Sequence, residues 1–221
     1  MRCITSENSV QAIITDPPYR MSYSGGGCFQ STTQTVRQRI AKIINFNPSC
    51  IDFYAELGIP SQYFFCSKDQ IFDYMKIFYS RGFSCTPCVW CKTNPTPFCH
   101  SSHLPDVEYL LFFSKAGRVW NSGLKPLSVY SRFYLSAKEE GSREGGGVHP
   151  TIKPLQLVSN KLLLSTAEGG TVLDPFGGSG TTLIAAERTG RRCIMLEHDE
   201  GYCQAIIARW EKETGQTAKM I

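Results

Sequence analysis

The sequence predicts a single α/β domain, residues 1–221, with a mainly parallel sheet and one antiparallel strand pair. The length suffices for one substantial core, and no linker divides the chain. In the second half, short apolar runs alternate with helical patterns, which is typical of a parallel sheet. Two motifs rich in Pro or Gly directly follow apolar runs, so polar residues are expected at the carboxyl ends of strands.

The first half begins with a short apolar run, Ala12–Thr15, that stops at two prolines. Because proline removes backbone donors, this run predicts a buried strand that ends there. Residues 21–35 are rich in Gly, Ser, Thr and Gln and predict a flexible loop. A second buried strand is expected at 63–66. A helix follows at 69–80, with its apolar residues on one face.

Residues 83–92 and 107–114 are strand candidates separated by a Pro-rich loop, and we expect them to pair antiparallel. Residues 116–147 lose the apolar periodicity and mix basic with aromatic residues, which predicts an inserted segment. The remaining elements alternate. They are a helix at 155–166, a strand at 171–173, a helix at 181–189, a strand at 193–196 and a helix at 202–213.

The composition narrows the class of protein. A net charge of +4 permits a polyanionic partner without identifying one. No apolar run reaches the roughly 18 residues of a membrane helix, and the first ten residues lack a signal-peptide layout. We therefore expect a cytoplasmic protein with no membrane association, in which the ten cysteines are free thiols.

A glycine-rich segment, Asp174–Thr182, joins a predicted strand to a predicted helix. Glycines allow the backbone to approach a ligand closely, and the helix start offers unpaired N–H groups. Glu197 follows Gly177 by twenty residues, at the end of the next strand, where a carboxylate can accept hydrogen bonds from ribose hydroxyls. This predicts a nucleoside-bearing ligand. Neither the dinucleotide fingerprint nor the P-loop lysine is present.

Asp16-Pro17-Pro18-Tyr19 supplies the groups that are required for transfer of a methyl group to an amino nitrogen. The lone pair of a base amino group is delocalised into the ring. Two acceptors, a carboxylate and a backbone carbonyl, favour a more tetrahedral nitrogen that can attack a sulfonium methyl in line. The ring of Tyr19 can stack on a base removed from the duplex.

Together these motifs resemble the amino-methylating DNA methyltransferases, which act on adenine N6 or cytosine N4. The catalytic motif precedes Asp174-Pro175-Phe176-Gly177-Gly178-Ser179-Gly180, the order of the family's β group. His149 to Pro154 matches a further cofactor motif of that group, and Trp90 to Pro95 resembles its middle region. The resemblance covers roughly residues 8–209 and implies a Rossmann-like methyltransferase fold with S-adenosylmethionine as cofactor.

The resemblance also implies roles for individual residues. Asp16, Pro17, Pro18 and Tyr19 would face the target base. Glu197 would bind the cofactor ribose, and His198 and Asp199 its adenine. The remaining cofactor residues would be Thr151, Lys153, Asp174, Phe176, Gly177, Gly178, Ser179, Gly180 and Thr181.

Two departures from the family pattern bear on the prediction. Relatives usually begin with another strand and helix, so one amino-terminal strand is expected to be missing. An open cofactor pocket and an exposed sheet edge would follow, and with them a homodimer or another protein partner. The inserted segment is also short, so sequence recognition is expected to involve few contacts, a partner subunit or the loop after Tyr19.

Alternatives to the adenine N6 assignment stay open. Asp rather than Ser at position 16 favours adenine, but a cytosine N4 methyltransferase fits the same chemistry. A catalytically degenerate DNA-binding module of the same fold is the non-enzymatic alternative. In each case the partner is double-stranded DNA, for which the candidate phosphate contacts are Arg20, Arg37, Arg39, Lys125, Arg132 and Arg143.

Three cysteines, Cys85, Cys88 and Cys91, lie near Cys99, His100 and His103 and could supply zinc ligands. On an extended strand, however, Cys88 points away from Cys85 and Cys91. We therefore predict buried thiols and no bound metal.

Overall fold

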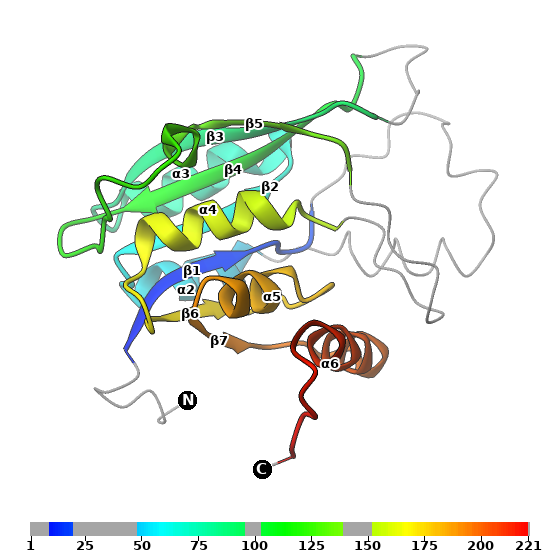
Figure 1. The fold of residues 1–221 in the computed structure, drawn as a ribbon. Helices are drawn as coiled ribbons and strands as arrows, with labels where there is room; N and C mark the ends of the chain where they lie inside the picture. The colour runs from blue at the N-terminus through cyan, green and yellow to red at the C-terminus, as the bar shows by residue number, and fades with distance from the viewer. Residues whose placement is uncertain (1–8, 20–47, 96–102, 139–151, 221) are drawn as a thin grey trace.

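The computed structural model describes residues 9–19, 48–95, 103–138 and 152–220. Over these ranges the chain forms a seven-stranded sheet in the order β5-β3-β4-β2-β1-β6-β7 (Figure 1). The strands are β1 (Val10–Thr15), β2 (Ser61–Cys66), β3 (Ser84–Lys92), β4 (Val107–Ser114), β5 (Phe133–Ser136), β6 (Thr171–Asp174) and β7 (Arg192–Met195).

The sheet is mainly parallel. β1 pairs in parallel with β2 on one side and with β6 on the other, and β6 continues in parallel to β7. β4 pairs antiparallel with β3, as the two runs at 83–92 and 107–114 predicted, and it also runs antiparallel to β2, a pairing that was not predicted. β5 lies parallel to β3 at the edge.

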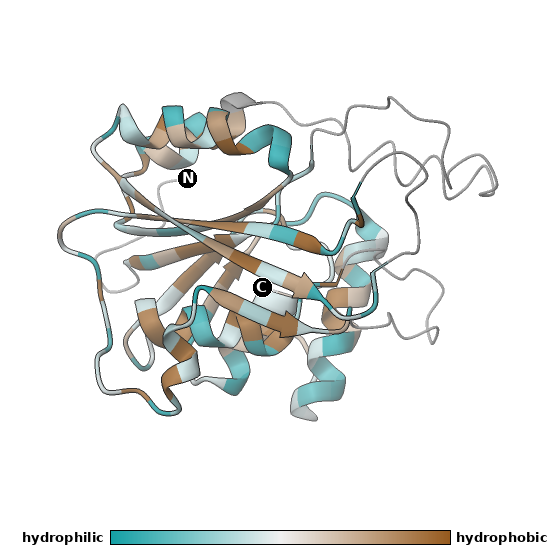
Figure 2. Ribbon diagram, turned by 90° about the horizontal axis from the view of Figure 1, so that it is seen from above, coloured by the Kyte–Doolittle hydropathy of each residue, from teal (hydrophilic) through white to brown (hydrophobic). Residues whose placement is uncertain are grey.

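Helices cover both faces of the sheet (Figure 1). α4 (Leu155–Ser165) and α5 (Thr181–Arg188) pack on one face, and α2 (Pro48–Glu56) and α3 (Ile71–Tyr79) on the other. α6 (Glu200–Thr214) follows β7. Single helical turns, η3 (Lys68–Gln70) and η4 (Leu127–Tyr130), complete the described elements. Apolar residues concentrate on the strands between the two helical layers (Figure 2).

Burial explains why the central strands read as continuous apolar runs. Every residue of β2 is buried, because both of its faces are covered. One core joins Ile14, Phe65 and Trp90 to α4 and α5. The other joins Ile13, Phe64 and Phe113 to α2 and α3.

Two elements were not predicted from the sequence. The first is α2, which has no strong apolar stripe. The second is β5, which falls inside residues 116–147 and joins that segment to the sheet. Residues 21–35, the predicted flexible loop, lie outside the described ranges, and so does the start of the chain. Within the described ranges the sheet ends at β7.

The strand order places a ligand site. Between β1 and β6 the order reverses, because β1 leads to β2 on one side whereas β6 leads to β7 on the other. A crevice forms outside the carboxyl ends of strands at such a switch point. Both chemical motifs of the sequence follow these two strands directly. Of the helices that are described, none has the length and apolar character of a membrane span.

Candidate active site

The predicted catalytic loop, Asp16 to Tyr19, starts immediately after β1 and is held in place at the end of β2. The carbonyl of Pro18 accepts a hydrogen bond from the side-chain nitrogen of Gln70, at 3.1 Å. Gln70 is fully buried, and its side-chain oxygen accepts from the Ser67 backbone at 3.0 Å. Gln70 was not among the predicted site residues, because Ser67 to Gln70 has the pattern of a capping box, which indicates a helix start and not a catalytic site.

The glycine-rich loop follows β6 and is hydrogen-bonded to the end of β1. Asp174 Oδ1 accepts from Thr15 Oγ1 at 2.6 Å and from the Phe176 backbone at 3.1 Å. Thr15 directly precedes Asp16, so a single carboxylate joins the two loops. Burial raises the pKa of Asp174 to about 7, although these hydrogen bonds oppose the shift.

Two glycines shape this loop. A Cβ on Gly177 would lie 2.8 Å from the Met195 side chain, so only glycine allows the loop to cross the end of β7 so closely. Gly180 has φ of +75° and starts α5, and a Cβ there would lie 3.2 Å from Ile206 of α6. Arg209 of α6 donates to the Ser179 carbonyl at 2.8 Å. α6 therefore supports the loop from behind.

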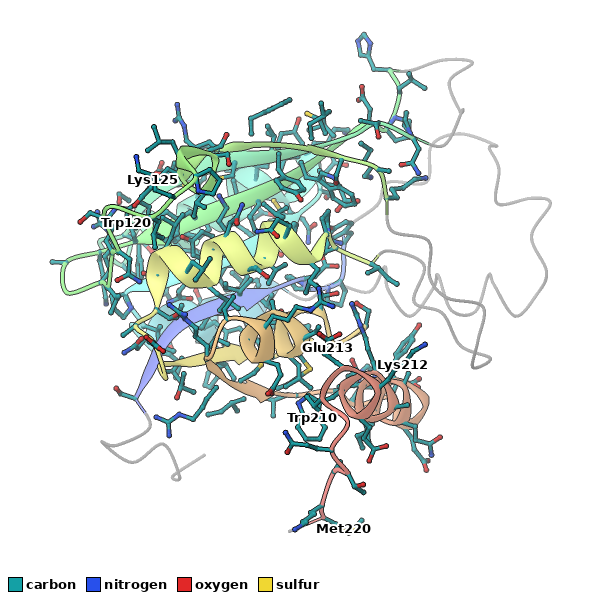
Figure 3. All side chains as sticks on the ribbon, viewed as in Figure 1. Trp120, Lys125, Trp210, Lys212, Glu213 and Met220 are labelled. Atoms are coloured by element: carbon teal, nitrogen blue, oxygen red, sulfur yellow. The ribbon has the colours of Figure 1, made fainter. Side chains whose placement is uncertain are left out.

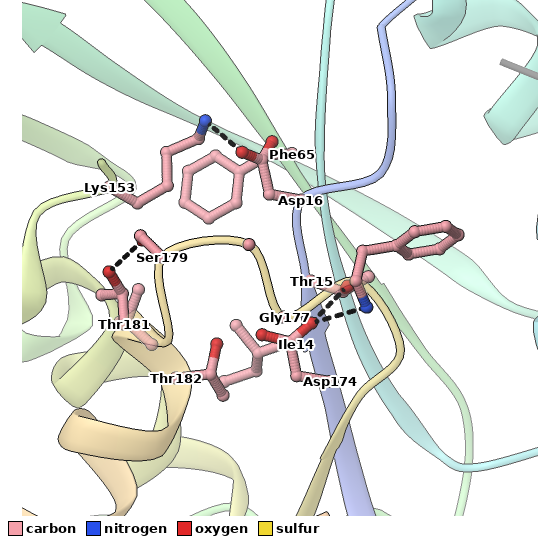
Figure 4. A pocket seen from close by; sticks show the side chains of 13 residues that line it. Ile14, Thr15, Asp16, Phe65, Lys153, Asp174, Gly177, Ser179, Thr181 and Thr182 are labelled. Atoms are coloured by element: carbon pink, nitrogen blue, oxygen red, sulfur yellow. Dashed lines mark hydrogen bonds and ion pairs between the residues drawn. The ribbon is translucent and has the colours of Figure 1, made fainter. Parts of the chain in front are cut away.

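Both loops line one pocket (Figure 4). The empty space that it encloses, counted together with the open solvent at its mouth, is about 390 Å³. Its lining residues are Ile14, Thr15, Asp16, Phe65, Lys153, Val158, Asp174, Phe176, Gly177, Gly178, Ser179, Thr181 and Thr182. Asp16 Oδ1 is buried and has no hydrogen-bond partner among the described residues. A buried acceptor without a donor is costly, so this atom is suited to a ligand donor.

The other carboxylate oxygen of Asp16 is occupied. Lys153 Nζ lies 2.5 Å from Asp16 Oδ2 and 3.3 Å from Glu108 Oε2. Lys92 Nζ lies 2.7 Å from the second oxygen of Glu108. Tyr19 donates its hydroxyl to Glu108 Oε2 at 3.2 Å. Lys153 was expected among the cofactor residues; it lines the shared pocket, but its ammonium group pairs with the carboxylate of Asp16.

Burial and charge act against each other in this cluster. Burial disfavours the charge on Lys153, but the carboxylates of Asp16 and Glu108 outweigh it and raise the Lys153 pKa. Burial likewise opposes the charge of Glu108, yet Lys153 and Lys92 lower its pKa. Burial and the nearby charges of Asp16 and Glu108 raise the Tyr19 pKa well above its usual value. Tyr19 therefore stays a hydroxyl donor.

Glu197 lies just after β7, at the strand end where a residue that binds ribose was predicted. Its carboxylate accepts from the backbone of Gly178 at 2.7 Å and from those of His198 and Asp199 at 2.8 and 2.9 Å. It thus ties the glycine loop to β7. Asp199 caps α6 by accepting from Gly201 and Tyr202, and the His198 side chain is 92% exposed. Their contact with a cofactor adenine stays a prediction.

The predicted phosphate contacts are only partly described. Arg20, Arg37, Arg39 and Arg143 lie outside the described residues, and so does Thr151 of the predicted cofactor set. Arg132 is exposed just before β5. Lys125 lies in the connection from β4 to β5, at the end of the sheet opposite the carboxyl end of β1 (Figure 3). The phosphate contact predicted for Lys125 stays a prediction.

The cysteines of β3 alternate as predicted. Cys88 packs in the core beside α4, and Cys85 packs against the core on the opposite face. Burial raises the pKa of Cys85 to about 11 and also raises that of Cys88. In the part of the chain that the structure describes, no three His, Cys, Asp or Glu side chains are grouped to hold a metal ion.

Comparison with known proteins decides the family. Residues 10–208 match the family model described as DNA methylase, which comprises N6 and N4 methyltransferases. The chain belongs to the DNA methylase family. It is 30% identical to the type II methyltransferase M2.DpnII of Streptococcus pneumoniae, over 93% of this chain and 84% of that one. It is 27% identical to M2.MboI of Moraxella bovis, over 94% and 83%.

Solved structures agree with this assignment. The M1.HpyAVI–SAM complex superposes with a TM-score of 0.65 at 27% identity, covering 95% of this methylase and 90% of that chain. The cytosine-N4-specific PvuII methyltransferase has a TM-score of 0.66 at 19% identity, which shows the fold alone. This methylase is therefore an S-adenosylmethionine-dependent DNA methyltransferase of Rossmann-like fold.

The described pocket fits that cofactor. The glycine loop lines it, and glycines allow the backbone to approach such a ligand closely. Glu197 has only 9% of its side chain exposed at the carboxyl end of β7, where ribose hydroxyls can donate to it. Asp16, whose Oδ1 has no partner among the described residues, lines the same pocket, so acceptor and cofactor can meet there. Bound cofactor supplies the electrophilic sulfonium methyl group.

Proposed function

We propose that this methylase transfers a methyl group to the N6 amino nitrogen of adenine in double-stranded DNA. The observation that carries the proposal is the buried Oδ1 of Asp16, which has no partner among the described residues and belongs to a residue that lines the pocket of the glycine loop. It is the acceptor that one hydrogen of the amino group needs.

A second acceptor is expected from the catalytic loop itself. The Pro18 carbonyl is bonded to Gln70, so the Pro17 carbonyl is the candidate for the other amino hydrogen. With both hydrogens held, the nitrogen lone pair is freed from the ring and can attack the sulfonium methyl. The N–C bond would form as the C–S bond breaks, the cofactor would leave as a neutral thioether, and the nitrogen would give one proton to the Asp16 carboxylate, which passes it to solvent.

Adenine reaches such a site only outside the helix stack, so we propose that the base is flipped from the duplex. Tyr19 is the stacking candidate, because its ring lies beside Asp16 and its hydroxyl is anchored to Glu108. Exposed Arg132 and the arginines at 20, 37, 39 and 143 are proposed phosphate contacts. Residues 116–147 are the proposed target-recognition segment.

A second proposal concerns partners and location. Phe133 and Leu135 of edge strand β5 are 52% and 60% exposed, which favours a homodimer or another protein partner. Because the substrate is DNA, we place the enzyme in the cytoplasm. Light scattering of the purified chain tests self-association, and a monomer at micromolar concentrations would contradict the homodimer.

Radiolabelled methyl transfer separates an enzyme from a degenerate DNA-binding module. The purified chain is incubated with labelled cofactor and either duplex or single-stranded DNA. We expect label in acid-insoluble DNA, with duplex preferred. Binding to duplex DNA without incorporation of label would favour the degenerate module.

A further inference from the structure

Glu108 of β4 is connected to both base-facing side chains of the catalytic loop, to Tyr19 directly and to Asp16 through Lys153, without lining the pocket itself. It accepts from Tyr19 directly, at 3.2 Å, and from Lys153, at 3.3 Å. Lys153 in turn holds Asp16 Oδ2. The glutamate side chain is 11% exposed, and no motif in the sequence marks it.

We propose that Glu108 is a positioning residue for methyl transfer, holding Tyr19 directly and Asp16 through Lys153. The inference rests on the proposed function of this site. Asp16 Oδ2 is fixed by Lys153, which leaves Oδ1 as the acceptor without a partner among the described residues. The same glutamate fixes the hydroxyl end of Tyr19, so the ring and the carboxylate keep one relative orientation.

The charges explain why a glutamate is needed. Asp16, Lys153, Glu108 and Lys92 alternate in sign along the cluster and sum to zero. Lys153 has 5% of its side chain exposed, so it depends on both carboxylates rather than on water. Without Glu108, its ammonium group would be drawn to Asp16 alone and would weaken the negative charge that Oδ1 presents to the amino group.

Fixed side chains around Lys153 also favour the geometry of methyl transfer. The ammonium of Lys153 lies 5.3 Å from the Tyr19 ring centre and 5.1 Å from that of Phe65, so it packs between two aromatic rings. Freed from Glu108, Tyr19 and Lys153 would sample other rotamers. A displacement of about 1 Å in such a site costs roughly 100-fold in rate.

The test compares Glu108→Gln with the matched control Glu56→Gln, an exposed glutamate of α2. Single-turnover methyl incorporation into duplex DNA is measured at saturating cofactor and DNA, and cofactor affinity is measured by calorimetry. We expect Glu108→Gln to lower the rate by about 10- to 100-fold and to leave cofactor affinity within about threefold. The control should match the wild type.

A second variant covers the case in which Glu108→Gln leaves two buried lysines poorly balanced and fails to fold. Glu108→Gln combined with Lys92→Met removes one charge of each sign, and we expect it to fold and still lose rate. In a Lys153→Met background, adding Glu108→Gln should cost less than it does alone, because one of its two connections is already gone.

Three results would overturn the inference. The first is a methyl-incorporation rate of Glu108→Gln within about twofold of the wild type. The second is a loss of cofactor affinity as large as the loss of rate. The third is that Glu108→Gln lowers the rate as much in the Lys153→Met background as it does alone. Incorporation by the wild type alone tests the proposed function, whereas the ratio of variant to wild type tests the positioning role. Failure of one is thereby distinguished from failure of the other.

Discussion

Asp16 is the residue on which the proposed chemistry depends, and its surroundings divide its two oxygens between different tasks. Oδ2 pairs with Lys153, and Oδ1 is left for a donor from the substrate. The type of residue and its loop were predictable from Asp-Pro-Pro-Tyr. The division was not, because Lys153 is 137 positions away and Glu108 belongs to a strand whose pattern indicates only burial.

The first prediction replaces Asp16 with alanine. Methyl incorporation should fall by at least about 100-fold, since a preorganised acceptor is lost, while cofactor affinity stays close to that of the wild type. Incorporation assays and calorimetry measure the two quantities. Asp52→Ala, on the surface of α2, is the matched control and should keep full activity. Near-normal turnover of the Asp16 variant would refute the assignment.

Asp174 predicts a pH dependence of stability. Burial raises its folded pKa from 3.8 to about 7, so between these values the folded chain holds a proton that the unfolded chain has released. Its contribution to the free energy of unfolding is therefore full below about pH 4 and is lost as the pH rises through 7. Denaturant unfolding at several pH values should show that wild type loses stability over this window relative to Asp174→Asn. Parallel curves would contradict the prediction.

Among the strands, some could be predicted from local sequence pattern, whereas one depends on pairing with another strand. The strands that become β1, β2, β6 and β7 were predictable because apolar runs end at sharp turn signals. β5 was not, since its alternation of exposed and half-buried residues over four positions is too short to stand out. Its strand character depends on pairing with β3.

Two glycines that flank α5 give a matched pair of variants. Gly180 and Gly190 have φ of +75° and +68°, so alanine at either position is strained by about 1–2 kcal/mol. Only Gly180 borders the pocket loop, where an added Cβ meets Ile206. We expect both variants to lose stability in thermal unfolding, Gly180→Ala at least as much as Gly190→Ala, and only Gly180→Ala to bind cofactor more weakly. Equal affinities by calorimetry would count against this account of the loop.

The cysteines of β3 predict a metal-free protein. Cys88 and Cys85 lie in cores on opposite faces of the sheet, so the strand cannot turn them to one ion. Elemental analysis of the purified chain should find no stoichiometric zinc, and circular dichroism should be unchanged by a chelator. One zinc per chain would overturn this reading.

For the whole molecule, topology unites motifs that are distant in sequence. Thr15 and Asp174 are 159 positions apart and share a hydrogen bond, because β1 and β6 are parallel neighbours whose carboxyl ends meet. The sequence predicted this meeting, since both motifs follow strands of one parallel sheet. It did not predict the supporting contacts from Gln70, Glu108 and Arg209, which depend on side chains that adjoin the site only after folding.

The central claim is methyl transfer to adenine N6, and nucleoside analysis tests it most directly. Unmethylated duplex DNA is incubated with the purified chain and S-adenosylmethionine, then digested to nucleosides for mass spectrometry. We predict N6-methyldeoxyadenosine, absent when Asp16→Ala replaces the wild type. N4-methyldeoxycytidine as the product, or no methylated nucleoside from a folded, cofactor-binding protein, would contradict the claim.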